Sequence, residues 1–148
     1  MAIYAENRKA RFNYEILEKY ETGIELLGTE VKSVRGGQVS LEGAFVIIRG
    51  GEAYIINANI PPYQAKNAPS DYDPLRNRKL LLTKKEINEL TGSEKNKSLT
   101  IVPISVYNKG RKIKVEIALV KGKKKFDKRD TIKKRETDRE LRREYKER

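Results

Sequence analysis

The last 28 residues, 121–148, limit how much of this chain can fold around a core. They hold 14 Lys or Arg and 7 Asp or Glu. Their large apolar or aromatic residues are Phe126, Ile132, Leu141 and Tyr145. These four do not share one face of a helix, so the segment cannot form a domain of its own. We therefore expect a folded body over 1–120 and a basic tail over 121–148 that is disordered or becomes helical on binding.

Charge and residue types exclude several functions. The chain carries a net charge of +12, with no Cys and no His. This removes disulfides, thiolate metal sites and the commonest general base, and we expect no metal or cofactor. No apolar run is long enough to span a membrane or to act as a signal peptide, so we expect a cytoplasmic protein with no membrane partner. The excess charge favours nucleic acid as the partner. A heat-adapted surface would explain the density of charges but not their imbalance.

The first 27 residues indicate extended structure after a short basic leader, 1–11. Apolar and polar residues alternate over 12–21, which predicts a half-buried strand. Thr22 and Gly23 should end that strand, and 24–27 should form a second short extended piece.

Two β-hairpins are predicted further along the chain. They pair 44–49 with 52–60, and 99–107 with 112–120. The return strand 112–120 alternates, which predicts one face in the core and one wet face. The core face has Ile113, Val115, Ile117 and Leu119, and the wet face has Lys112, Lys114, Glu116 and Ala118. Gly50 and Gly51 suit the first turn, and Gly110, in the connection 108–110, suits the second. Pro103 interrupts its strand pattern and is expected at an edge or a bulge.

Two helices are predicted from their first residues. Thr83 and Glu86 have capping-box spacing, which predicts a helix that ends at Gly92. Thr29 should cap a shorter helix, with Glu30 in its first turn, where the helix dipole favours negative charge. Val31 and Val34 should then face the core. This leaves three residues towards solvent or a ligand: Lys32, Ser33 and Arg35.

About six strands with no βαβ alternation indicate a mainly β, antiparallel fold. An oligonucleotide-binding type of β-barrel is the expected version, because closure removes exposed strand edges. The segment 63–77 has no periodicity and should be a long mobile loop. Its carboxylates Asp71 and Asp73 are expected to form turns. No nucleotide-binding loop or nucleophile motif is present, so we do not expect an enzyme.

Basic side chains at element edges support nucleic-acid binding. They are Arg8, Lys9, Arg11, Lys32, Arg35, Arg76, Arg78 and Lys79. Each alone is most simply a solvated surface charge. Together with the tail they predict at least two anionic contact surfaces, and some Tyr residues can stack on bases.

Five strings along the chain form an ordered set of motifs. They are Asn7-Arg8-Lys9-Ala10-Arg11, Gly28-Thr29-Glu30-Val31-Lys32-Ser33, Asn57-Ala58-Asn59-Ile60, Arg78-Lys79-Leu80-Leu81-Leu82 and Gly122-Lys123-Lys124-Lys125-Phe126-Asp127-Lys128-Arg129. In this order they resemble the small protein B (SmpB) family of bacterial tmRNA-binding proteins. The resemblance implies a barrel that holds the tRNA-like domain of tmRNA. It also implies a tail that enters the empty mRNA path of a stalled ribosome, near the small-subunit rRNA of the decoding centre.

The resemblance assigns tmRNA contacts in the body to Arg8, Lys9, Arg11, Glu30, Lys32, Ser33, Arg35, Asn57, Asn59, Arg78 and Lys79. A carboxylate can accept from base amino groups and a lysine can hold a phosphate. Glu30 as a helix-dipole partner is equally consistent with the sequence. Asn57 and Asn59 either read base edges or cap the turn before Pro61.

The resemblance also assigns ribosome contacts to the tail residues Lys123, Lys124, Lys125, Phe126, Asp127, Lys128, Arg129, Lys133, Lys134 and Arg135. Phe126 keeps a face that stacks on rRNA but has no ring hydrogen bond to offer. We expect a monomer whose partners are tmRNA and the ribosome. Two alternatives remain: a ribosomal protein or general RNA chaperone with a basic arm, and an acid-assisted RNA hydrolase, which the absence of His disfavours.

Overall fold

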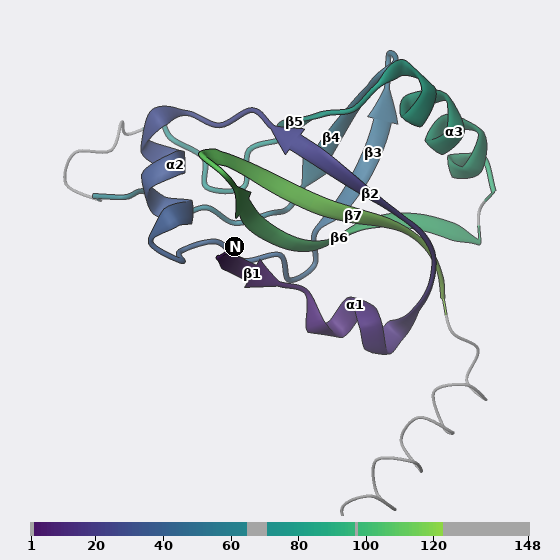
Figure 1. Ribbon diagram of the computed structural model, residues 1–148, viewed down its shortest axis with the longest axis horizontal. Helices are drawn as coiled ribbons and strands as arrows, with labels where there is room; N and C mark the ends of the chain where they lie inside the picture. Colours follow the sequence, from purple (N-terminus) through teal and green to yellow (C-terminus); the bar gives the residue numbers. More distant parts are fainter. Residues whose placement is uncertain (1, 65–70, 97, 123–148) are drawn as a thin grey trace, which may run out of the picture.

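The computed structural model describes residues 2–64, 71–96 and 98–122, which form strands joined by short helices (Figure 1). Their order is β1 (Ile3–Glu6), α1 (Arg8–Asn13), β2 (Tyr14–Ile24), α2 (Gly28–Arg35), β3 (Phe45–Arg49), β4 (Glu52–Ile56), β5 (Arg78–Leu81), α3 (Lys84–Glu94), β6 (Leu99–Lys109) and β7 (Lys112–Gly122). The loop expected over 63–77 falls partly outside the described residues.

The strands form one antiparallel sheet that closes on itself. Neighbours run β6-β3-β4-β5-β2-β7, and β7 pairs again with β6, while β1 adds to β6 from outside the ring. The expected mainly β, antiparallel fold is confirmed, with seven strands in the described residues instead of about six. The sequence did not predict β5, a four-residue strand that joins β4 to β2 and so completes the ring.

Both predicted hairpins are confirmed, although β4 ends at Ile56 and not at residue 60 as predicted. In the first, Arg49 pairs with Glu52, and the two turn glycines have φ values of 58° and 74°. Residues with a side chain rarely adopt such backbone angles, which is why glycine occupies both positions. The second turn is Gly110 and Arg111 instead of the expected connection 108–110, since Asn108 and Lys109 still pair with Ile113 and Lys112.

β2 is one continuous strand and does not break where the sequence suggested. Thr22 pairs with Val115, and its hydroxyl donates to the Val115 carbonyl at 3.0 Å. Gly23 pairs with Leu81, and a Cβ at Gly23 would lie 3.2 Å from the Leu81 Cβ. The glycine therefore permits a close approach of β5 to β2 and does not end the strand.

The sequence suggested a basic leader over 1–11, but the N-terminal residues form β1 and α1. The carboxamide oxygen of Asn7 caps α1 by accepting from the Ala10 N–H at 3.2 Å. The Asn7 amide donates to the Pro103 carbonyl at 3.0 Å, where β6 is irregular. The predicted bulge at Pro103 is thus confirmed, and α1 covers it.

Helix boundaries differ from the prediction at two ends. Leu27, not Thr29, is the N-cap of α2, and its N–H donates to the Glu30 carboxylate at 2.8 Å. In α3 the capping box of Thr83 and Glu86 is confirmed. However, α3 continues through Gly92 to Glu94, and the Glu94 carboxylate accepts from the Ile48 N–H of β3 at 3.1 Å.

The ring encloses the main core, and a smaller core lies beneath α1. The main core includes Val46, Ile55, Leu80, Ile101 and Ile117. The smaller one contains Ala10, Val102, Ile104, Ala118 and Val120. The sequence placed Ala118 on a wet face of the return strand. That prediction is wrong, because the unpredicted α1 covers this part of β7.

Candidate nucleic-acid interface

A buried ionic cluster fastens α2 to the segment that follows β4. It consists of Glu30 on α2, Arg78 at the start of β5, and Tyr72 and Arg76 in the preceding loop; we call it the α2 cluster. Glu30 is 1% exposed and Arg78 is 0% exposed. Arg78 Nε donates to Glu30 Oε2 at 2.7 Å, and Arg76 Nε donates to the same oxygen at 3.1 Å. The Tyr72 hydroxyl lies 3.0 Å from Glu30 Oε2.

Glu30 is ionised despite its burial. Burial raises the pKa of this carboxyl, but hydrogen bonds from Arg76, from the Leu27 N–H and from Arg78 lower it to about 2. A buried carboxylate with several donors is stable as the anion, and it balances the buried guanidinium of Arg78. The α2 cluster is therefore a charged network with its partners inside the protein.

The α2 cluster also fixes the backbone between β4 and β5. Arg78 donates to the carbonyls of Ala58 at 2.9 Å and Pro74 at 3.0 Å. The Tyr72 hydroxyl lies 2.8 Å from the Ile60 carbonyl oxygen, and the Ser33 hydroxyl donates to the Pro61 carbonyl at 2.6 Å. Side chains from α2 and β5 thus hold the path of residues 58–61.

Asn59 lies on this held segment, Asn57 directly precedes it, and both are exposed. Asn57 has a φ of 64°, a left-handed conformation that Asn tolerates better than most residues. Asn59 forms a two-way backbone bridge with Ser40, with both N···O distances at 2.9 Å. The carboxamides therefore stand on a backbone fixed from two sides.

Three predicted RNA contacts are buried. Glu30, Ser33 and Arg78 have exposed fractions of 1%, 0% and 0%. The prediction that Ser33 faces solvent or a ligand is wrong, because its hydroxyl points inward to Pro61. The inward face of α2 is polar, since Glu30 and Ser33 share it with Val34.

The outward face of α2 carries Lys32 and Arg35, both exposed as predicted. The Lys32 ammonium lies 5.8 Å from the centre of the Tyr63 ring, within cation–π range. Arg35 donates to the backbone carbonyl of Arg111 at 3.0 Å, in the turn between β6 and β7. Lys79 is half-buried and pairs with Glu52 at 2.9 Å, which raises the pKa of Lys79.

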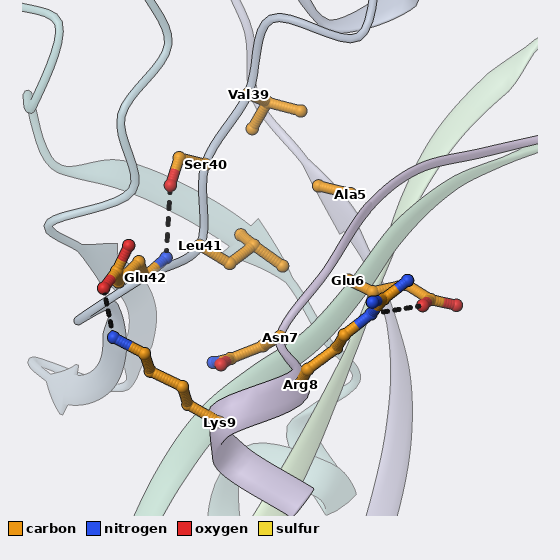
Figure 2. Close-up of a pocket in the computed structure, with 9 residues that line it drawn as sticks. All are labelled: Ala5, Glu6, Asn7, Arg8, Lys9, Val39, Ser40, Leu41 and Glu42. Carbon is orange, nitrogen blue, oxygen red and sulfur yellow. Dashed lines mark hydrogen bonds and ion pairs between the residues drawn. The ribbon is translucent and has the colours of Figure 1, made fainter.

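α1 presents Arg8, Lys9 and Arg11, all of them exposed. Arg8 lies 3.9 Å from the Glu6 carboxylate, and Lys9 pairs with Glu42. Figure 2 shows these two pairs on opposite sides of a groove between α1 and residues 39–42. We call them the α1 pairs.

α1 and α2 lie at different ends of the molecule. Tyr14, directly after α1, pairs with Gly122, the last described residue. The tail predicted from residue 121 therefore begins beside α1, and Lys121 itself still belongs to β7, where it pairs with Glu15 of β2. Figure 1 shows α2 at the other end, beside the turn between β6 and β7. The ten predicted tail contacts lie outside the described residues.

Sequence reasoning missed the α2 cluster. Tyr72 was one of the Tyr residues expected to be able to stack on bases, and Arg76 and Arg78 were expected to be basic groups at element edges. One signal was available: Arg78 and Leu80 share a parity, and both are buried in β5. Recognising β5 as a strand would have placed Arg78 in the interior.

The described residues contain no group of three or more His, Cys, Asp or Glu that could hold a metal ion. None of the helices in this part of the chain is long and apolar enough to cross a membrane. The described part is thus a small, basic, ring-closed antiparallel β protein, with polar and basic side chains exposed around α1 and α2.

Comparison with known proteins identifies which family has this form. The pattern of the SmpB protein family matches residues 4–147, so the chain belongs to that family. Relatives called "SsrA-binding protein" come from Gloeothece citriformis and Elusimicrobium minutum. They are 51% and 53% identical, over 97% of this chain and 93% and 91% of the relatives.

A solved structure supports the same relationship. It is described as "tmRNA-SmpB: a journey to the center of the bacterial ribosome", and a chain in it is similar at a TM-score of 0.67 with 49% sequence identity. The alignment covers 81% of this chain and 84% of that chain.

Proposed function

We propose that this protein binds the tRNA-like domain of tmRNA and brings it to stalled ribosomes for trans-translation. The observation that carries the proposal is identity of about half the residues, over nearly the whole chain, to proteins called "SsrA-binding protein". The similar chain in the tmRNA-SmpB structure adds a second line of support.

The closed ring acts, in this proposal, as an oligonucleotide-binding type of barrel and as the tmRNA-binding body. Polar and basic residues make the contacts: the exposed Arg8, Lys9, Arg11, Lys32, Arg35, Asn57 and Asn59, and the half-buried Lys79. Glu30, Ser33 and Arg78 act indirectly, because they are buried and hold the backbone that carries Asn57 and Asn59. The protein binds and positions RNA in the cytoplasm and does not catalyse a reaction.

The tail, in this proposal, takes the place of mRNA near the decoding centre. Its ten contact residues run from Lys123 to Arg135. The body and the tail then have separate partners, and the two activities should be separable.

Truncation after Gly122 tests that separation. This cut leaves β7 paired over its full length with β2 and β6, whereas a cut after Val120 would remove the last β7 pairs. We expect the truncated body to keep its affinity for the tRNA-like domain and to lose peptide tagging on stalled ribosomes. Loss of RNA affinity as complete as the loss of tagging would contradict the division between body and tail.

A competition assay tests specificity. The full chain is bound to labelled tRNA-like domain, and an unrelated structured RNA is added as competitor at several salt concentrations, because phosphate contacts weaken steeply with salt. We expect the unrelated RNA to compete poorly. Equal competition would instead identify a general RNA chaperone or a ribosomal protein.

A further inference from the structure

Strand β2 is hydrogen-bonded on one side only over most of its length. On one side it pairs with β7 from Tyr14 to Gly23, whereas β5 on the other side reaches only Gly23 and Ile24. No further strand of the described residues pairs with β2. We call the open side of residues 14–19 the β2 edge. Backbone N–H and C=O groups on such an edge can pair with a strand from another chain.

The side chains of the β2 edge are acidic, although the chain as a whole has a net charge of +12. Glu15 and Glu18 are both exposed. Neither forms an ion pair with a residue that the structure describes. Lys19, the one basic residue within 14–19, pairs instead with Glu116 of β7 at 3.8 Å. The β2 edge therefore repels phosphates and attracts cations.

A bulge in β2 places the two carboxylates on the same face of the strand. Glu15 lies opposite Lys121 and Glu18 lies opposite Leu119, with a register shift between the two pairs. Lys121 and Leu119 are two residues apart on β7, so their side chains share a face, and those of Glu15 and Glu18 do too. Without the extra residue, Leu17, positions three apart would face opposite sides. The carboxylates are thus roughly 7 Å apart along the strand.

Glu18 shares its nearest hydrogen-bond donor with a second carboxylate. The buried Tyr20 hydroxyl, next on the same face, donates to Glu89 of α3 at 3.2 Å. Burial raises the pKa of Tyr20, and the neighbouring carboxylates of Glu18 and Glu89 raise it further. A phenol has one proton to donate, so it cannot satisfy both carboxylates at once. A cation that reaches the β2 edge therefore displaces no existing partner.

The bulge residue Leu17 adds an exposed apolar group between the two carboxylates. Its exposed fraction is 47%. Open strand edges are commonly protected from self-association by bulges and by charges of the same sign as those of approaching copies. Here the charges have the opposite sign to the net charge of the chain, so they do not repel other copies. Protection against self-association therefore does not account for this edge.

We propose that the β2 edge docks an extended segment of another protein that is rich in Lys or Arg, and that this segment adds to β2 as a strand. Its backbone hydrogen-bonds to the open side of β2, its basic side chains at alternate positions meet Glu15 and Glu18, and an apolar side chain covers Leu17. The recognised pattern is basic–apolar–basic in an extended chain. This inference goes beyond the proposed function and does not depend on it.

Two other occupants fit the β2 edge less well. RNA would bring phosphates towards Glu15 and Glu18, which is unfavourable. The chain's own tail leaves β7 at Gly122, on the opposite side of β2, and would have to cross the junction between α1 and β2 to reach the open side. A basic segment of a separate protein meets neither obstacle.

A set of synthetic peptides tests the mode of binding. The probe is a capped six-residue peptide of alternating Lys and Val, added to the ¹⁵N-labelled full chain, with binding followed by amide chemical shifts. We expect saturable shifts within residues 14–19. A peptide with the same sequence but N-methylated at alternate backbone positions should bind at least about 10-fold more weakly, because it cannot form the strand hydrogen bonds. Equal binding of the two peptides would overturn strand addition.

A pair of protein variants tests the acidic side chains. Glu15→Gln and Glu18→Gln are combined in one full-chain variant, and the matched control combines Glu25→Gln with Asp71→Asn, two exposed acids elsewhere. Both variants lose two negative charges, and thermal unfolding checks that both are folded. The edge variant should bind the alternating peptide about 3- to 10-fold more weakly, while the control keeps the wild-type affinity. Equal affinities in the two variants would contradict the proposal.

Two further outcomes would assign the β2 edge to another occupant. If truncation after Gly122 raises the affinity for the alternating peptide more than about 10-fold, the chain's own tail occupies the edge and the separate partner is wrong. If the edge variant loses affinity for the tRNA-like domain of tmRNA but not for the peptide, the edge belongs to the RNA-binding surface and the proposal is wrong. Unchanged RNA affinity together with weakened peptide binding supports it.

Discussion

The α2 cluster and the α1 pairs use the same residue types in opposite ways. Around Glu30 the charges are buried and held by several donors, and backbone carbonyls use the remaining guanidinium N–H groups. Around Glu42 both partners are exposed, with the Lys9 and Glu42 side chains 71% and 68% accessible. A buried network fixes positions, whereas an exposed pair can exchange its partner for a phosphate at little cost. The difference separates residues that shape a binding surface from residues that make contact.

The largest effect should come from Glu30→Gln. This change leaves Arg78 buried without its counter-charge, and we expect the free energy of unfolding to fall by about 3 to 5 kcal/mol. Chemical denaturation measures it. Glu42→Gln, the same change at an exposed pair, should leave the unfolding midpoint almost unchanged. Similar losses in the two variants would remove the contrast between the regions.

A double variant sharpens the same test. Adding Arg78→Met to Glu30→Gln removes the uncompensated cation and should restore part of the lost stability. A further drop in stability would mean that Arg78 acts mainly through the carbonyls of Ala58 and Pro74.

Acid should weaken the α2 cluster specifically. The pKa of Glu30 is about 2 in the folded chain and lies below its unfolded value. Its stabilisation is therefore fully present above the unfolded pKa and is lost as pH falls towards 2. The loss amounts to about 3 kcal/mol. The stability difference between wild type and Glu30→Gln, measured by urea denaturation, should shrink between about pH 6 and about pH 3. A constant difference would contradict this assignment.

Ser33→Ala should have a smaller effect. It removes the hydrogen bond to the Pro61 carbonyl, and we expect a loss of about 1 kcal/mol in the free energy of unfolding. Affinity for the tRNA-like domain should also fall, because the backbone that carries Asn59 loosens. Ser40→Ala is the control, since the Ser40 hydroxyl is exposed and accepts only a long 3.4 Å bond from the Glu42 N–H. Equal effects of the two changes would argue against a positioning role for Ser33.

Lys9→Gln should have the smallest effect on folding and a visible one on RNA binding. The unfolding midpoint should not change, and the salt dependence of RNA binding should fall by about one unit of slope. Lys95→Gln, at the C-terminal end of α3, is the control variant and should leave the salt dependence of RNA binding unchanged. A large loss of stability in Lys9→Gln would mean that the α1 pair is structural.

Sequence patterns predicted the elements whose signals are local. The glycine turn at 50–51 and the capping box at Thr83 each depend on a few adjacent residues, and both are confirmed. The return strand was assigned to the correct residues, although its outer face was misread where α1 covers Ala118.

The missed elements depend on partners far away in the chain. α1 has six residues, too few for a periodic pattern, and is held by Asn7 contacting Pro103 of β6. β5 has four residues and is a strand because β2 and β4 flank it. Gly23 looked like a strand end because its role, a close approach to Leu81, is tertiary.

The sequence identified residues of the candidate site but did not show which of them are exposed and which are buried. The exposed residues of the two short helices, Lys32, Arg35, Arg8 and Lys9, were expected at the surface, and the structure places them there. Glu30, Ser33 and Arg78 were expected at the surface too. Sequence alone cannot show that Arg78 bonds to Glu30, 48 positions away, or that the Ser33 hydroxyl bonds to the Pro61 carbonyl, 28 positions away.

The pairing of β7 has a mechanical consequence. Its hydrogen bonds run to β2 on one side and to β6 on the other, from Lys114 to Lys121. A strand that is hydrogen-bonded on both edges cannot bend or slide without breaking bonds to both neighbours. β7 therefore fixes the distance between the hairpin turn and the last described residue. Removing one residue from β7 would shorten this distance by roughly 3.3 Å and turn every following side chain to the opposite face of the sheet. A change in the length of this strand thus also changes which face each later side chain occupies.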